Sequence, residues 1–109
     1  MSRIAARFKT LAAEGRGALI PYLEAFDPDF ETSLALLKAM PAAGADLIEV
    51  GMPFSDPSAN GPVIQLAARR GLKAGATLAG VLDLIADFRK DDQDTPVILM
   101  GYLNPVEAY

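Results

Sequence analysis

Glu49 is the residue of this chain with the clearest capacity for chemistry. It lies in the apolar run 47–50 and precedes a loop, 53–62, that is rich in Pro, Gly, Asp and Asn. Burying a carboxylate costs free energy unless the group is paired or takes part in a reaction. Apolar surroundings disfavour the charged form of a carboxyl group, so Glu49 could hold a proton and donate it near neutrality. Taken alone, the pattern is equally compatible with a structural Glu49 that bonds a backbone amide.

The composition narrows the classes of function. The chain has 109 residues, enough for one small domain, and 51% of them are hydrophobic, so a buried core is feasible. It contains no His or Cys, so acid–base chemistry would fall on carboxylates, Lys or Tyr, and we expect no metal site. A net charge of −4 without any basic block argues against a nucleic-acid partner. No apolar run is long enough for a membrane span, and residues 1–17 lack the apolar centre of a secretory signal.

Helical and extended patterns alternate along the chain. Short apolar runs bounded by Gly, Pro or Asp predict three strands, near 18–23, 46–50 and 96–101. Apolar residues at helical spacing predict helices near 4–15, 30–43, 63–73 and 78–88, and the start of another at 104–107. Strands separated by helices of this length are typical of parallel sheets, with the helices between strands on one side.

Alternation within the second strand assigns its faces. Leu47 and Glu49 fall on one face, and Ile48 and Val50 fall on the other. One face of a parallel barrel lines the interior while the other packs on helices. Glu49 is therefore expected near the carboxyl end of a strand, on the interior side, where such folds keep their active sites.

Two loops resemble those of one enzyme family. Residues 53–62 read PFSDPSANGP, close to the PFSDPxADGP of the tryptophan synthase alpha subunit, and residues 21–29 read PYLEAFDPD, close to its PYLTAGDPD. The resemblance extends over all 109 residues. It implies a single domain over 1–109 that forms an incomplete (β/α)8 barrel: an N-terminal helix, the first three strands with their helices, and the start of the next helix.

The resemblance also implies residue roles. The family is a lyase that releases indole and glyceraldehyde 3-phosphate from indole-3-glycerol phosphate, in tryptophan biosynthesis in the cytoplasm. Glu49 matches its general acid/base, and Asn60 matches an Asp that accepts the indole N–H and stabilises the developing charge. The positions that wall the indole pocket in the family correspond to Tyr22, Ile64, Met100 and Tyr102.

A partner is implied in the same way. Pro53, Asp56, Pro57 and Asn104 match the surface that meets the beta subunit, and pyridoxal phosphate belongs to that subunit. The resemblance therefore implies no cofactor in this chain.

Three departures bear on activity. Asn60 is neutral where the family has a carboxylate, and Glu24 and Phe26 stand where Thr and Gly are usual, at positions expected to face the same mouth as Glu49. These changes suggest a site that was altered on purpose or released from its original task, although ordinary loop variation would give the same pattern. The family's phosphate-binding loops belong to later strands, so we expect 109 residues alone to be inactive.

Two other interpretations stay open. The chain could be a fragment or an engineered barrel module without catalysis, which would self-associate through its unpaired strand edges. It could also be another phosphate-binding barrel, such as a phosphoribosyl isomerase, although such a protein would not need the PFSDP sequence at this spacing.

Overall fold

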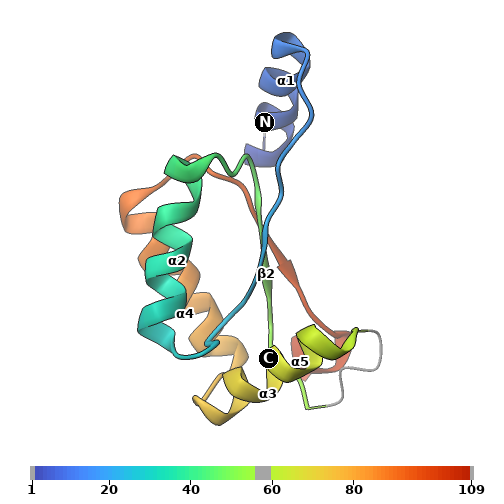
Figure 1. The fold of residues 1–109 in the computed structure, drawn as a ribbon, viewed down its shortest axis with the longest axis vertical. Helices are drawn as coiled ribbons and strands as arrows, with labels where there is room; N and C mark the ends of the chain where they lie inside the picture. Colours follow the sequence, from blue (N-terminus) through green and yellow to red (C-terminus); the bar gives the residue numbers. More distant parts are fainter. Residues whose placement is uncertain (1, 56–59, 109) are drawn as a thin grey trace.

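Three strands form one parallel sheet in the order β1–β2–β3 (Figure 1). They span Tyr22–Glu24 (β1), Ile48–Gly51 (β2) and Val97–Met100 (β3). The structure is a computed structural model and describes residues 2–55 and 60–108. The register sets Glu49 of β2 opposite Tyr22 of β1 and Ile98 of β3. The predicted parallel pairing of all three strands is confirmed.

Five helices accompany the sheet within the described residues. They span Arg3–Glu14 (α1), Phe30–Ala43 (α2), Pro62–Lys73 (α3), Leu78–Asp91 (α4) and Leu103–Ala108 (α5). Figure 1 shows α2 and α4 side by side along one side of the sheet, with α1 beyond one end of the strands and α5 near the other. Among the helices between strands, α3 differs from the expectation, because it packs near the carboxyl end of β1 and not along the sheet face.

The core lies between the sheet and the α2–α4 layer. One face of the strands contributes Leu23, Ile48 and Val50, all of them buried. The helices supply the opposing side chains, namely Leu37 of α2 and Val81, Leu84 and Phe88 of α4. The other strand face, which points away from α2 and α4, carries Tyr22, Glu24 and Glu49. Alternation thus places the apolar residues toward the helices and the polar ones on this opposite face, called the barrel side below because the sequence predicts that it faces the interior of a barrel.

Short polar residues begin two of these helices. Asp29 accepts a hydrogen bond from the backbone N–H of Thr32 at 2.7 Å, and Thr77 accepts one from Gly80 at 3.0 Å. Each satisfies a donor that the first helical turn leaves unpaired. These caps fix where α2 and α4 begin, and therefore which side chains face the sheet.

Two boundaries differ from the sequence expectation. The first strand was expected over 18–23, but β1 begins at Tyr22 because Pro21 has no N–H to donate and the Leu19 carbonyl accepts from Asp46 and Leu47 at the start of β2. The last helix was expected to start at 104, but it begins at Leu103, so Asn104 lies within α5.

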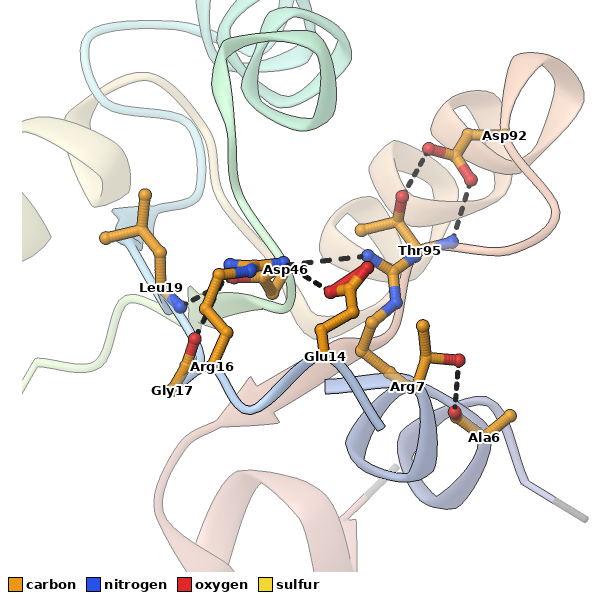
Figure 2. Close-up of polar contacts among 10 residues, drawn as sticks. Ala6, Arg7, Glu14, Arg16, Gly17, Leu19, Asp46, Asp92 and Thr95 are labelled. Carbon is orange, nitrogen blue, oxygen red and sulfur yellow. Dashed lines mark hydrogen bonds and ion pairs between the residues drawn. The ribbon is translucent and has the colours of Figure 1, made fainter. Parts of the chain in front are cut away.

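A buried carboxylate joins α1 to the start of β2 (Figure 2). Arg16 donates to both oxygens of Asp46, at 2.9 and 3.0 Å, and the Leu19 N–H donates to the same carboxylate at 2.8 Å. Arg7 of α1 lies 4.0 Å from it. The hydrogen bonds from Arg16 and then from Leu19 lower the pKa of Asp46 to about 2. This cluster holds the N-terminal end of the strands, opposite to the end that bears the candidate site.

No helix among residues 2–55 and 60–108 is both long and apolar enough to cross a membrane.

Candidate functional site

A cavity of about 300 Å³ opens at the carboxyl ends of the strands. Its lining consists of Tyr22, Met52, Asn60, Met100, Gly101, Tyr102 and Leu103. The set draws on β1, the last residue of β3, the two loops that follow β2 and β3, and the first residue of α5. Carboxyl ends of parallel strands meet at one edge of a sheet, which is why positions far apart in the sequence gather here.

Four residues expected at a binding pocket line this cavity. Tyr22, Asn60, Met100 and Tyr102 all contribute to it. Ile64, which was also expected in the wall of the indole pocket, is partly buried in the first turn of α3 and lies outside the lining. The structure thus brings most of the expected pocket wall together, while the role of each residue stays a prediction.

Glu49 lies beside this cavity without lining it. It is opposite Tyr22 in the register of β1 and β2, and its side chain is partly exposed. Within the residues that the structure describes, its carboxylate takes part in no hydrogen bond or ion pair. The carboxyl group is therefore available on the barrel side of the sheet, where a bound molecule could meet it.

Tyr22 contributes a hydroxyl group to the wall of the cavity. Burial, and then the hydrogen bond to Glu24, raise the pKa of the Tyr22 hydroxyl; the charges of Glu24, Glu49 and Tyr102 act in the same direction. The hydroxyl is thus neutral across the ordinary pH range.

Asn60 places a neutral amide at the cavity. Its backbone carbonyl accepts a hydrogen bond from Gln65 Nε2 at 2.7 Å, so the end of the loop is tied to the first turns of α3. The side chain is partly buried and can accept a hydrogen bond through its amide oxygen, but it brings no negative charge.

Sequence reasoning missed three lining residues. Met52, Gly101 and Leu103 flank the strand ends, and a Cβ built on Gly101 would lie 2.7 Å from Cε of Met52. The ring of Tyr102 also packs against that of Phe54, with the centroids 5.1 Å apart and the two planes tilted by 31°. Apolar residues next to strand ends carry no distinctive sequence signal, so only the packing of the two loops identifies them.

The two departures at the carboxyl end of β1, Glu24 and Phe26, do not both face the mouth, which corrects the sequence expectation. Phe26 is buried in the core: its ring meets Phe30 of α2 edge-on at 5.4 Å and lies against Gly80 of α4. Its φ of 67° turns the chain so that the side chain points away from the cavity. Glu24 is on the barrel side, but it is 5% exposed and lies behind Tyr22.

The expected partner surface is only partly described. Pro53 is buried against Gly71 of α3, which leaves its interface role a prediction. Asp56 and Pro57 fall outside the described residues, and Asn104 has its backbone within α5.

No group of three or more acidic residues that could hold a metal ion occurs in the described part of the chain.

Comparisons with known proteins agree on one family. The family described as "Tryptophan synthase alpha chain" matches residues 8–109. The chain is 72% identical over 109 residues to the tryptophan synthase alpha chain of Gluconacetobacter diazotrophicus and 69% identical to that of Gluconobacter oxydans. Each match covers 100% of this chain and 40% of the relative.

Solved structures give the same result. Tryptophan synthase subunit alpha from Legionella pneumophila superposes with a TM-score of 0.98 at 47% identity, covering 100% of this chain and 42% of that one. An aminoacrylate-bound tryptophan synthase from M. tuberculosis has a TM-score of 0.90 at 35% identity and is covered to 44%. The chain thus spans about 40% of the length of the curated relatives it matches, and its three parallel strands correspond to part of their (β/α)8 barrel.

Proposed function

The chain belongs to the tryptophan synthase alpha chain family, and we propose that it contains the acid–base residue and part of the indole pocket of an indole-3-glycerol phosphate lyase. The reaction releases indole and glyceraldehyde 3-phosphate, a step of tryptophan biosynthesis. The cavity is the observation that supports this proposal, because Tyr22, Asn60, Met100 and Tyr102 surround it and Glu49 lies in register beside Tyr22.

In this proposal Glu49 is the general acid/base. It moves protons between the glycerol hydroxyl of the substrate and C3 of the indole ring while the carbon–carbon bond between them breaks. Its partly exposed carboxyl group, without a hydrogen-bonding partner in the described part of the chain, supports such a role. The aromatic and thioether side chains of the cavity would hold the flat, apolar ring.

Asn60 would weaken the catalyst. As the ring takes up positive charge, a carboxylate at this position would stabilise it, whereas the amide of Asn60 can only accept the indole N–H bond. Removing one such preorganised electrostatic partner costs about 100- to 1,000-fold in rate. A chain of 109 residues would additionally lack the phosphate-binding loops that the family places on later strands, so this polypeptide alone would be inactive.

The partner and cofactor follow from the family. We propose that the loop 53–57 and Asn104 meet a beta subunit, which would hold pyridoxal phosphate, and that this chain needs no cofactor. The cytoplasmic location stays a prediction, which cell fractionation with an antibody to the chain would test.

The test is the release of indole from indole-3-glycerol phosphate by a full-length alpha chain that contains these 109 residues. Glu49→Gln should abolish turnover, because Gln cannot exchange a proton and this segment has no His to replace it. Leu66→Gln, on the exposed side of α3, is a matched control and should leave turnover unchanged. Full activity of Glu49→Gln would overturn the assignment.

A second candidate is a self-associating barrel module without catalysis. In the described sheet β1 and β3 each pair with one strand only, and Leu99, Met100 and Leu103 are exposed beside β3. The mass of the natural polypeptide separates the two candidates: 11.5 kDa favours the module, and about twice that or more favours a longer chain.

A further inference from the structure

Tyr22 and Glu24 form a pair on the barrel side of β1. The Tyr22 hydroxyl donates a hydrogen bond to Oε1 of Glu24 at 2.6 Å. Since the two residues are separated by one position in a strand, their side chains lie on the same face. Glu24 is 5% exposed, so the acceptor of this hydrogen bond is buried, whereas Tyr22 is partly buried and lines the cavity.

Gly51 of β2 leaves the space that this pair occupies. It is the register partner of Glu24, and a Cβ built on it would lie 1.8 Å from Oη of Tyr22 and 2.3 Å from Oε1 of Glu24. Real Cβ atoms do not come so close to other atoms, so any other residue at 51 would displace the pair. The absence of a side chain at Gly51 on β2 therefore leaves room for the hydrogen bond between Tyr22 and Glu24 on β1.

The two members of the pair differ in their relation to the cavity. Tyr22 lines the cavity and lies opposite Glu49, whereas Glu24 is outside the lining. We propose that Glu24 is a positioning residue of the lyase site: it holds the Tyr22 hydroxyl so that the ring remains a fixed wall and the hydroxyl does not engage Glu49. This inference rests on the proposed function.

The physical reason is competition for one donor. The Tyr22 hydroxyl is partly buried, and if it lost its acceptor it would form a hydrogen bond with another group within reach, because an unsatisfied polar group costs free energy. Glu49 is the carboxyl-bearing residue opposite Tyr22 on the neighbouring strand, and its charge already contributes to the raised pKa of the Tyr22 hydroxyl. A hydrogen bond from Tyr22 would stabilise the charged form of Glu49 and make it a weaker proton donor.

The electrostatics agree with this arrangement. Burial raises the pKa of Glu24, while the hydrogen bond from Tyr22 lowers it and the charge of Asp27 raises it. The net effect is a pKa of Glu24 above its ordinary value, and among the described residues the carboxyl group takes part in no ion pair, so the Tyr22 hydroxyl is its hydrogen-bond partner.

The experiment is a double-mutant cycle in a full-length alpha chain that contains this segment, with kcat and KM measured for indole-3-glycerol phosphate. Glu24→Leu should lower kcat about 10-fold and change KM less. A 10-fold change in kcat is about the scale of energetic coupling expected between neighbouring side chains. Glu24→Gln keeps an acceptor oxygen and should stay within about 3-fold of the unmodified chain.

The decisive variant removes the hydroxyl as well. Tyr22→Phe with Glu24→Leu should recover kcat to within about 3-fold of Tyr22→Phe alone, because no donor remains to reach Glu49. A merely structural Glu24 predicts the opposite, a double variant at least as impaired as Glu24→Leu. If Glu24→Leu fails to fold, Glu24→Ala, which likewise has no acceptor oxygen, replaces it with the same expectations.

The outcomes separate the two proposals. An unmodified full-length chain without lyase activity overturns both the proposed function and this inference. An active chain in which Tyr22→Phe gives no recovery, or in which Glu24→Gln is as impaired as Glu24→Leu, overturns the role of Glu24 alone.

Discussion

At the scale of single residues, Asn60 and Phe26 are the substitutions with the largest expected effects. Asn60 lines the cavity with a neutral amide, and Phe26 is buried in the core with φ of 67°, a conformation in which glycine is the easier residue. The first bears on the reaction and the second on stability. They can be tested separately, since Phe26 points away from the cavity.

Asn60→Asp should raise the rate of indole release by about 100- to 1,000-fold in a full-length chain, because it restores one charged partner for the developing cation. The same change in the isolated 109 residues should not rescue turnover, since the substrate phosphate would have no anchor. Asn60→Ala serves as the control and should not exceed the rate of the unmodified chain. A family-like rate with Asn60 in place would contradict the mechanism.

Phe26→Gly sets two effects against each other. Glycine relieves the positive φ, worth about 1 kcal/mol, but removing a buried aromatic ring costs about 3–5 kcal/mol. We expect the loss of packing against Phe30 and Gly80 to dominate, so that the full-length protein loses about 2–4 kcal/mol of unfolding free energy in urea.

Phe26→Leu is the matched control, since it keeps the strained backbone and much of the buried volume, and it should cost less than Phe26→Gly. A gain in stability on Phe26→Gly would show that backbone strain outweighs packing here.

At the scale of elements, close packing of β1 on β2 depends on Gly51. Gly51→Ala places a methyl group where the Tyr22–Glu24 pair now lies, and overpacking of this kind costs about 1–3 kcal/mol of unfolding free energy. Gly17→Ala is the control, because a Cβ there meets nothing within 4 Å, and it should change stability by under about 0.5 kcal/mol. Adding Tyr22→Phe to Gly51→Ala should recover part of the loss; no recovery would mean that the clash lies elsewhere.

The cluster around Asp46 makes the junction of α1 and β2 sensitive to acid. The pKa of this carboxyl group is lowered to about 2 in the folded chain from an ordinary 3.8, so its stabilising effect is present above about pH 4 and is lost as pH falls towards 2. Asp46→Asn should therefore lower the midpoint of thermal unfolding at pH 6, as followed by circular dichroism. The difference in midpoint between this variant and the unmodified protein should become smaller as the pH falls towards 2.

Lys38→Met is the control for that experiment, since it breaks an exposed ion pair with Asp91 and should leave the pH profile unchanged. A difference between Asp46→Asn and the unmodified protein that stays constant from pH 6 to pH 2 would contradict the role of the charge.

At the scale of the whole molecule, the isolated polypeptide of residues 1–109 should self-associate. Its sheet has an open edge at β1 and another at β3, and Leu19, Leu99, Met100 and Leu103 are exposed near them. Sedimentation equilibrium should show a mass that increases with concentration. Leu99→Lys should weaken the association, because a charge opposes burial at the β3 edge. A cooperative monomer at high concentration would disprove this expectation.

Local signals in the sequence determined most of the architecture. Apolar runs between Gly, Pro and Asp located β2 and β3, and the helices between strands implied parallel pairing, because sequence period and turn residues act over a few positions. The same local pattern predicted which face of β2 bears Glu49. It does not identify the buried face of α4, in which Leu82 is 36% exposed while Leu84 is fully buried. Both residues are compatible with a helical period, and only contact with the sheet distinguishes them.

The tertiary structure alone decided how the site is supported. Glu24 and Phe26 read alike as changes at one rim, yet one pairs with Tyr22 under Gly51 and the other turns into the core through a positive φ. Asp46 accepts hydrogen bonds from Arg16, which lies 30 positions away in the sequence. These contacts join positions far apart in the chain, and their geometry depends on how strands and helices pack, which no local pattern of residue types encodes.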